Sequence, residues 1–477
     1  MAATSRHELQ TDIPSRMDRL PFSRFHMLVI AALGITWILD GLEVTIVGSI
    51  GPVLQDRQTL ALTASQVGSA ASCYVIGAAL GALGFGWLTD RYGRRRIFNV
   101  TLGIYLLGVL LTSLSWDALS FALFRILTGV GIGGEYASVN SAIDELIPAR
   151  LRGRIDMTVN GSYWFGAAIG AAGSVLLLNG TLVSLNAGWR IGFATGGVLG
   201  LAVILLRRFV PESPRWLITH DRQRQANQTI AQIERDVREQ SQELPQPEGK
   251  PLTIHPQRHF GFRPIFAAMF GKFRARSALA LTLMIAQAFL FNAVFFTYGL
   301  ILARFYHVPP TRTGLYILPL AVGNLLGPLL LGSLFDSVGR KRMIVACYAL
   351  TAVLLTAVAV LFGLHIFDAW TQTVAWMVIF FVASTAASSA YMTASEIFPL
   401  ETRSLAIAVF YAAGTAVGGI LAPWIFGRLI GAGGVWQVAG GYLAAAVLML
   451  SGALAEGFLG VAAEGKSLEN VASPISS

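Results

Sequence analysis

Two carboxylates stand inside an apolar stretch near the start of the chain. Asp40 and Glu43 are three residues apart within residues 27–52, so a helix places both on one face. Arg125 lies inside another apolar stretch, residues 118–143. If both stretches cross a membrane, a rise of about 1.5 Å per residue puts Arg125 and the two acids at one depth. We predict that Arg125 faces both acids and that this group binds and releases a proton; a static structural ion pair is the alternative.

A run of glycines follows Arg125 and ends at Glu135. The glycines between residues 129 and 134 would let a neighbouring helix approach closely. Glu135 lies about 15 Å along the helix from Arg125. Two roles stay open for it: an inner station for the proton, or an anchor for cytoplasmic arginines such as Arg94 or Arg152.

A second group of charged residues occurs twice. The segment GWLTDRYGRR begins at Gly86 and GSLFDSVGRK begins 246 residues later, while Glu-x-x-Pro-x-x-x-Arg recurs with an offset of 251. Two motifs with nearly one offset indicate a duplicated half. An Asp beside guanidinium groups at a helix end can form charge-assisted hydrogen bonds to a neighbouring helix. We therefore predict a cytoplasmic gate made of Gly86, Asp90, Arg91, Gly93, Arg94, Arg95, Glu145, Arg152, Asp336, Gly339, Arg340, Glu396 and Arg403.

The composition indicates the elements that must position these residues. The chain is 54% hydrophobic and only 13% charged, against about 25% charged in soluble proteins, so it is expected to be an integral membrane protein. Twelve apolar stretches are each near the roughly 20 residues needed to span a bilayer as a helix. They cover residues 27–52, 65–88, 97–115, 118–143, 157–180, 189–206, 278–303, 314–335, 343–364, 371–394, 405–428 and 434–459.

The basic residues predict which side of the membrane each loop occupies. With the N-terminus placed inside, 29 of the 35 Lys and Arg residues fall in cytoplasmic segments, so both termini are expected in the cytoplasm. The net charge of +9 follows this sidedness and does not indicate nucleic acid.

The chain divides into three predicted regions. Residues 1–206 form an N-terminal six-helix bundle, and residues 277–477 form a C-terminal six-helix bundle with a cytoplasmic tail. Residues 207–276 are a cytoplasmic linker with short amphipathic helices, at 223–243 and 262–274. The linker is expected to brace the two halves; a partner-binding or regulatory role is the alternative.

The repeated cassette resembles the signature of the major facilitator superfamily, and the resemblance covers nearly the whole chain. It implies an all-α membrane protein with twelve transmembrane helices in two pseudo-symmetric six-helix bundles. Residues 211–217 (PESPRWL) and 464–469 (EGKSLE) resemble elements of sugar porters. The pair Asp40-Gly41-Leu42-Glu43 and the run Gly133-Gly134-Glu135 are more similar to metabolite:proton symporters, including nicotinate, aromatic-acid and synaptic-vesicle relatives. In that group the first-span acids and the fourth-span acid are assigned to proton movement.

The seventh span departs from the sugar-porter pattern. Gln287 and Asn292 keep the spacing of sugar-binding amides, but Ala286 replaces the first of two adjacent Gln residues. Hexose transport is therefore disfavoured, because a polyol needs many hydrogen bonds. The predicted lining is aromatic with a few amides, and it suits a small molecule with one polar head. It consists of Asn160, Trp164, Gln287, Asn292, Phe295, Phe296, Tyr298 and Tyr391.

Together these features predict a proton-coupled symporter in the bacterial inner membrane, acting as a monomer by alternating access. The expected substrate is an organic carboxylate such as a nicotinate- or benzoate-like acid. Three alternatives remain: a proton-antiporting exporter of drugs or organic cations, a sugar:proton symporter, and a non-transporting sensor on the same fold. An enzyme is disfavoured, since no nucleophile–base pair, metal cluster or phosphate loop is evident, and no cofactor is expected. The partners are the substrate, the proton and the lipid bilayer, with no nucleic acid.

Overall fold

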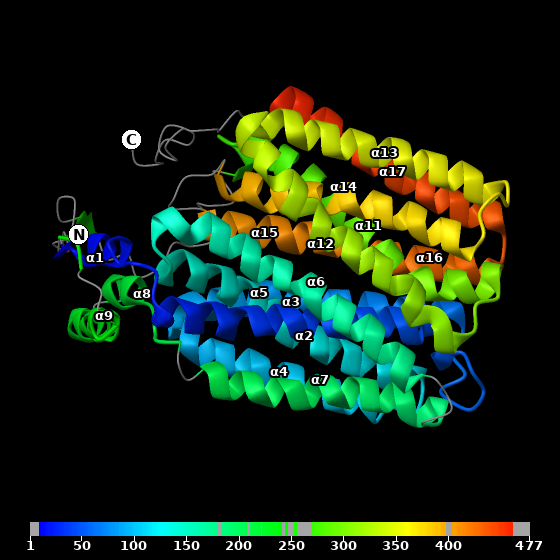
Figure 1. The fold of residues 1–477 in the computed structure, drawn as a ribbon, viewed down its shortest axis with the longest axis horizontal. Coiled ribbons are helices and arrows are strands. Elements are labelled where there is room, and N and C mark those ends of the chain that lie inside the picture. Colours follow the sequence, from blue (N-terminus) through cyan, green and yellow to red (C-terminus); the bar gives the residue numbers. More distant parts are fainter. Residues whose placement is uncertain are drawn as a thin grey trace, which may run out of the picture.

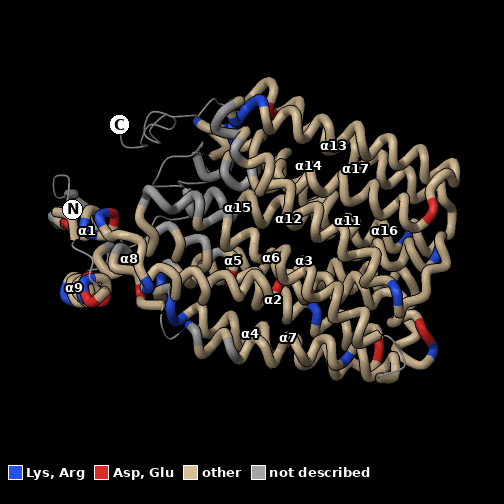
Figure 2. The backbone as a smooth tube through the Cα atoms, viewed as in Figure 1, with Lys and Arg blue, Asp and Glu red and all other residues tan. Residues whose placement is uncertain are grey.

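Long helices run side by side along the length of the molecule, and the first and last described residues lie at the same end of the bundle (Figure 1). The computed structural model describes residues 9–178, 183–207, 210–220, 222–240, 244–246, 252–254, 269–396 and 403–460. Charged residues gather toward the ends of the helices, and the middle of the bundle is largely uncharged (Figure 2). This distribution is expected of helices that span a membrane, because a charged side chain within hydrocarbon is costly.

The first half contains six long helices. They are α2 (Arg24–Leu54), α3 (Ala64–Tyr92), α4 (Arg94–Ser113), α5 (Ala118–Leu146), α6 (Ala149–Leu177) and α7 (Leu185–Arg207). Local signals set their ends. Asp117 caps α5 by accepting a hydrogen bond of 2.8 Å from the backbone N–H of Ser120. Gly93, with φ of 91°, separates α3 from α4 in a conformation that favours glycine.

The second half repeats this plan. It contains α11 (Arg274–Tyr306), η1 (Pro310–Arg312), α12 (Thr313–Ser337), α13 (Arg340–Gly363), α14 (Ala369–Glu396), α15 (Arg403–Gly414), η2 (Thr415–Gly419), α16 (Ile420–Ala432) and α17 (Val435–Leu459). The short π-helical turn η2 joins α15 to α16 without a break. Gly339, with φ of 103°, separates α12 from α13 as Gly93 separates α3 from α4, which agrees with the predicted duplication.

Eleven helices within the described residues are long and apolar enough to cross a membrane. Helix α6 is a further helix of 29 residues, and it packs along α2. The twelve apolar stretches of the sequence therefore each correspond to a long helix, with α15, η2 and α16 forming a single span.

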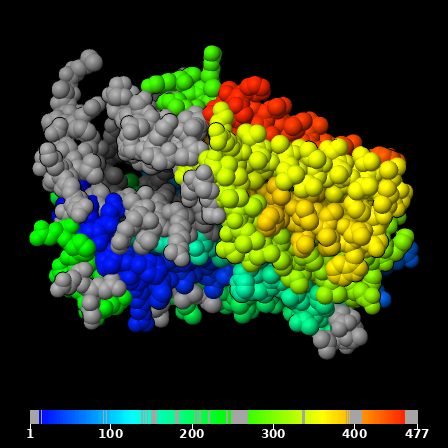
Figure 3. Space-filling view, turned by 45° about the horizontal axis from the view of Figure 1, so that its top comes forward, coloured from blue at the N-terminus to red at the C-terminus, as the bar shows by residue number. Residues whose placement is uncertain are grey.

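The two halves pack against each other at the end of the bundle remote from the first and last described residues (Figure 3). Three helix pairs cross there at glycines. A Cβ atom on Gly48 would lie 2.1 Å from the carbonyl oxygen of Phe295, which joins α2 to α11. A Cβ on Gly68 would lie 2.4 Å from the carbonyl of Pro423, and one on Gly314 would lie 2.4 Å from the carbonyl of Ala171. Side chains larger than hydrogen would force these helices apart.

Short elements cover the other end of the first half. They are β1 (Leu9–Thr11), α1 (Ile13–Asp18), α8 (Pro214–Thr219), α9 (Gln223–Arg238) and β2 (Leu252–Ile254), which pairs antiparallel with β1. The apolar stripe of α9 is buried: Ile230, Ile233 and Val237 pack with Ile13 and Met17 from the N-terminal segment. Helix α9 lies within the predicted helix 223–243, whereas residues 262–268 of the second predicted linker helix, 262–274, lie outside the described residues.

Charged side chains fasten the N-terminal segment to α9. Arg16 donates to both carboxylate oxygens of Glu234, at 3.0 and 2.7 Å, and Arg19 donates to one of them at 2.5 Å. Burial opposes ionisation of this carboxyl group, but the hydrogen bonds from both arginines outweigh it and hold the pKa of Glu234 below its ordinary value.

Candidate functional site

Arg125 and Glu43 form a buried ion pair in the first half. Arg125 Nη1 of α5 donates a hydrogen bond to Glu43 Oε1 of α2, and the exposed fractions of the two residues are 0% and 2%. The guanidinium group also lies over the ring of Tyr74, 4.2 Å from its centroid. The structure thus brings together the base and one of the acids that the sequence placed at the same depth. Desolvated charges of this kind are stable only when both partners are present.

The second acid, Asp40, is held differently from the expected arrangement. Its Oδ1 accepts a hydrogen bond of 2.6 Å from the hydroxyl of Tyr74 in α3, and its Oδ2 accepts one of 2.5 Å from Tyr136 in α5. Among the described contacts, Arg125 therefore bonds to Glu43 alone and acts on Asp40 only through its charge. Sequence reasoning missed both tyrosines, because a single Tyr in an apolar helix is usually a packing residue.

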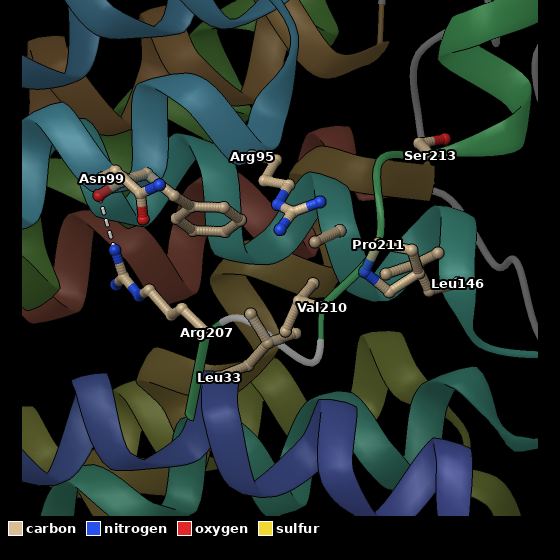
Figure 4. Close-up of a pocket in the computed structure, with 10 residues that line it drawn as sticks. Leu33, Arg95, Asn99, Leu146, Arg207, Val210, Pro211 and Ser213 are labelled. Atoms are coloured by element: carbon tan, nitrogen blue, oxygen red, sulfur yellow. Dashed lines mark hydrogen bonds between the residues drawn. The ribbon is translucent and has the colours of Figure 1, made fainter. Parts of the chain in front are cut away.

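Glu135 also has a buried basic partner, which the sequence analysis did not name. Arg207, the last residue of α7, lies with its Nη2 2.8 Å from Glu135 Oε2. Arg207 also donates to the hydroxyl of Thr36 at 3.0 Å and to the carbonyl of Phe98 at 2.6 Å, the bond drawn in Figure 4. The two expected anchors, Arg94 and Arg152, have side chains outside the described residues.

A small pocket adjoins Arg207 at the end of the first half nearest α8 (Figure 4). Two arginines and several apolar side chains line it: Leu33, Arg95, Phe98, Asn99, Ala142, Leu146, Arg207, Val210, Pro211 and Ser213. None of the residues predicted to bind substrate is among them. This pocket is therefore distinct from the predicted central site.

Aromatic side chains from both halves form a continuous cluster near Asp40. Trp164 of α6 lies with its ring centroid 5.7 Å from that of Phe291 and 5.5 Å from that of Phe295, both in α11. Phe295 in turn lies 5.0 Å from Phe380 of α14, while Tyr163 lies 4.8 Å from Trp164. Offset and edge-to-face aromatic packing of this kind presents flat apolar surfaces to a ring.

The remaining predicted substrate residues lie in several environments. Asn292 is half-buried, and its Nδ2 donates to the carbonyl of Ala288 at 2.7 Å. Gln287 is buried and its Nε2 lies 3.8 Å from the sulfur of Met284, while Asn160 is half-buried. Phe296 also belongs to the predicted lining, and its ring centroid lies 6.0 Å from that of Tyr74.

Tyr298 and Tyr391 differ from the other residues predicted to bind substrate. Tyr298 is fully buried inside the second half, where its hydroxyl lies 2.7 Å from that of Thr373 and its ring packs against Trp376. The hydroxyl group of Tyr298 therefore already has a hydrogen-bond partner within the protein. The side chain of Tyr391 lies outside the described residues.

The predicted gate is described only in part. Gly93 and Gly339 occupy the equivalent turns of the two halves, and Arg91 is exposed beside the rings of Trp87 and Tyr92. The backbone N–H of Arg95 donates to Glu212 at 3.3 Å. Gly86 lies within α3 and Arg340 begins α13. The side chains of Asp90, Arg94, Glu145, Arg152, Asp336, Glu396 and Arg403 lie outside the described residues, so the gate stays a prediction.

Comparison with known proteins identifies the family. Residues 30–473 match the family model described as "Sugar (and other) transporter". The chain belongs to the sugar (and other) transporter family. The match extends through both halves, so the predicted relationship to the major facilitator superfamily is confirmed, and the protein is a membrane transporter and not an enzyme.

Several proteins similar to this chain are named as transporters of small metabolites. The niacin transporter NiaP of Acinetobacter baylyi is 26% identical over 475 residues, which cover 96% of this chain and 99% of the relative. The 4-hydroxybenzoate transporter PcaK of Pseudomonas aeruginosa is 29% identical over 213 residues, or 44% of this chain and 46% of the relative. A gallate transporter of Pseudomonas putida is 27% identical over 46% of this chain and 47% of the relative.

Solved structures of transporters share the fold. The inward-open xylose transporter XylE from E. coli superposes with a TM-score of 0.70 at 19% identity, covering 94% of this chain and 98% of that one. A crystal structure of a D-xylose-proton symporter gives a TM-score of 0.68 at 19% identity, covering 89% of this chain and 97% of that one. At this identity the likeness concerns the fold alone, and it confirms the predicted all-α architecture of twelve transmembrane helices.

Proposed function

We propose that this transporter is a proton-coupled symporter of small aromatic carboxylates. The observation that carries the proposal is the buried group formed by Asp40, Glu43 and Arg125, which adjoins an aromatic cluster shared by both halves. The setting is the bacterial inner membrane with both termini in the cytoplasm, as the distribution of basic residues and the bacterial relatives support.

The acidic group supplies the coupling step. A proton that binds to Asp40 or Glu43 cancels one negative charge and weakens the hold of Arg125 on α2. The loaded carrier then passes between its two conformations without an uncompensated charge in the hydrocarbon, which would be costly. The halves rock about the central site and carry the substrate with the proton. Two further parts of the proposal come from the sequence. Glu135 takes part in proton coupling, and the gate residues hold the cytoplasmic ends of the helices together in one of the two conformations.

The shape of the aromatic cluster supports the substrate class. Trp164 from one half packs on Phe291 and Phe295 from the other, so a flat substrate placed against this cluster would contact both halves at once. Asn292 and Gln287 of α11 supply a few amide groups. A polyol would leave most of its hydroxyl groups without partners on such surfaces, whereas a ring with one carboxylate would not. The named relatives for niacin, 4-hydroxybenzoate and gallate support the same class.

Uptake into proteoliposomes tests the proposal. Purified protein is reconstituted, and uptake of labelled nicotinate, 4-hydroxybenzoate, xylose and an organic cation is measured with the outside acidic, with equal pH, and with the outside alkaline. We expect the aromatic acids to accumulate above equilibrium only when the outside is acidic. Accumulation of xylose alone would favour a sugar symporter. Accumulation of organic cations with the acidic side inside would favour an antiporting exporter, and the absence of flux for every compound would favour a sensor.

A further inference from the structure

The two tyrosines that bind Asp40 occupy both of its oxygens. An ionised carboxylate accepts hydrogen bonds at each oxygen, so two hydroxyl donors fit the ionised form. A protonated carboxyl group carries an O–H of its own and cannot accept a bond at that position in the same way. Protonation of Asp40 therefore breaks or reverses one of the two tyrosine hydrogen bonds.

The surroundings of the two tyrosines differ. Tyr74 is buried beneath the guanidinium of Arg125, and its hydrogen bond to Asp40 is fully enclosed. Tyr136 is only partly buried, and its ring lies 5.2 Å from that of Tyr411 in α15, across the boundary between the halves. Of the two bonds, the one to Tyr136 is thus the more accessible from the space between the halves.

Tyr136 also connects to the aromatic cluster. The ring centroid of Trp37 lies 4.3 Å from that of Tyr136 and 6.5 Å from that of Tyr163. Tyr163 is in turn in contact with Trp164. A chain of adjoining rings therefore runs from the donor at Asp40 to the flat surfaces around Trp164. A substrate ring held among those surfaces can direct a polar head toward the hydroxyl of Tyr136.

We propose that Tyr136 is a switch donor that binds the proton site and the substrate in turn. Its hydroxyl binds Asp40 while that carboxylate is ionised, and it binds the carboxylate of the substrate once Asp40 is protonated. This inference rests on the proposed transport of aromatic carboxylates. It makes proton binding a condition for tight substrate binding, because the ionised Asp40 both occupies the donor and repels an anion.

Other ionisable groups face this site and set its background charge. They are Glu43 on α2, Tyr74 on α3, Tyr105 on α4, Arg125 on α5, Tyr163 on α6 and Tyr411 on α15, with the Glu135–Arg207 pair beside Thr36, one helical turn from Asp40. Arg125 supplies the positive charge next to Asp40. It stays paired with Glu43 when Tyr136 changes partner, so the switch requires no movement of the ion pair.

The variants Tyr136→Phe and Tyr74→Phe form a matched test, since each removes one hydroxyl donor from the same carboxylate and keeps the ring. Uptake of labelled nicotinate is measured in proteoliposomes over a range of external pH and concentration. Both variants lose a donor that favours ionised Asp40, so in both the pH of half-maximal uptake is expected to rise by about one unit. Only Tyr136→Phe is expected to raise the half-saturating nicotinate concentration at low pH, by about tenfold.

A purely structural Tyr136 would give a different pattern. Equal half-saturating concentrations for the two variants at low pH would overturn the switch, even if both show the shift in pH dependence. Nicotinamide, which keeps the ring but lacks the anionic group, serves as a binding competitor whose affinity should not change in Tyr136→Phe.

A second measurement needs no variant. Binding of nicotinate to the wild-type protein in weakly buffered detergent solution should be accompanied by proton uptake above the pH of half-maximal transport. Binding without proton uptake would contradict the proposal even if Tyr136→Phe fails to fold. If the wild-type protein neither binds nor transports nicotinate or 4-hydroxybenzoate, the proposed function fails first and the switch with it, which distinguishes the two failures.

Discussion

The two halves of the molecule share a plan but differ in what they bury. The first half buries Asp40, Glu43, Arg125, Glu135 and Arg207 between its helices. In the second half, Glu456 is the buried charged residue among those that the structure describes. At the offset of 251 residues that relates the second repeated motif, Arg125 corresponds to Trp376, which is equally buried.

This difference shows that two halves with the same fold can carry different functional side chains at equivalent positions. Trp376 packs against Phe380 and Tyr442, so the position that holds a charge in the first half holds an aromatic core in the second. In the proposed mechanism the first half binds the proton, and the second half offers aromatic surface to the substrate. The substrate then joins the halves because it contacts both.

The largest effect is expected from Arg125→Ala, which leaves Glu43 buried without its partner. Loss of one member of a buried pair costs about 3–5 kcal/mol of folding free energy, so the melting temperature in detergent should fall steeply and uptake should be lost. The double variant Arg125→Ala/Glu43→Gln removes both charges and should recover much of the stability but not the proton-driven uptake. Arg428→Ala, at an exposed arginine of the second half, is the control. Full activity of Arg125→Ala would contradict the role of the pair.

The next largest effect is expected from replacing a buried acid, and it should differ between the two halves. Asp40→Asn cannot exchange a proton, so accumulation driven by a pH gradient should be abolished, while exchange of internal for external nicotinate continues. Glu456→Gln, at the buried acid of the second half, should keep accumulation within about twofold of the wild type. If Glu456→Gln abolished accumulation, or if Asp40→Asn left it unchanged, the proton site would not belong to the first half alone. Uptake and counterflow assays on the same vesicles provide both measurements.

A smaller effect concerns the aromatic contact between the halves. Trp164→Ala removes the ring that faces Phe291 and Phe295, and the half-saturating concentration of nicotinate should rise by about tenfold, as expected for one or two lost aromatic contacts. Trp116→Ala, at a tryptophan that is 71% exposed, should leave it unchanged. Similar changes in both variants would place the substrate elsewhere.

The smallest effect is expected where α1 docks on α9, beneath the first half. Glu234→Gln loses its ion pairs with Arg16 and Arg19 and should destabilise this contact by about 1 kcal/mol, seen as faster hydrogen exchange in residues 13–18 with uptake unchanged. The pKa of Glu234 is lowered in the folded protein, so its contribution is present above about pH 4.3 and is lost as the pH falls through the lowered value. Asp236→Asn, at a half-buried acid on the same helix whose side chain bonds only to Gln232 among the contacts of the described residues, is the control. Unchanged exchange in Glu234→Gln would show that the apolar stripe alone holds α1.

The sequence was sufficient for the fold because each span is a continuous apolar stretch. The stretch predicted at 27–52 is α2 at Arg24–Leu54, and that at 278–303 is α11 at Arg274–Tyr306. The helices exceed the predictions at their ends, since basic residues such as Arg24 and Arg274 continue a helix beyond the hydrocarbon. Depth along the helix axis was likewise enough to match Arg125 with Glu43.

Rotation of each helix about its own axis could not be predicted in the same way. This rotation determines which side chains point toward Asp40, and here they are Tyr74 and Tyr136. It likewise determines that Arg207 contacts Glu135 and that Tyr298 points into the second half. These contacts join helices whose order in the bundle does not follow from their hydropathy. Arg207 was also assigned to the linker because it follows the last apolar residues of its span, although it ends α7 and turns inward.

The π-helical turn η2 has a consequence for the register of the span that contains it. A π-turn accommodates an additional residue, and each residue of a helix adds about 100° of rotation. Residues before the turn, including Tyr411, therefore present a different side from the one a regular helix would give them relative to Pro423 and Gly427. Deleting a single residue within Thr415–Gly419 would swing Tyr411 away from Tyr136 while leaving the glycine crossing with α3 in place.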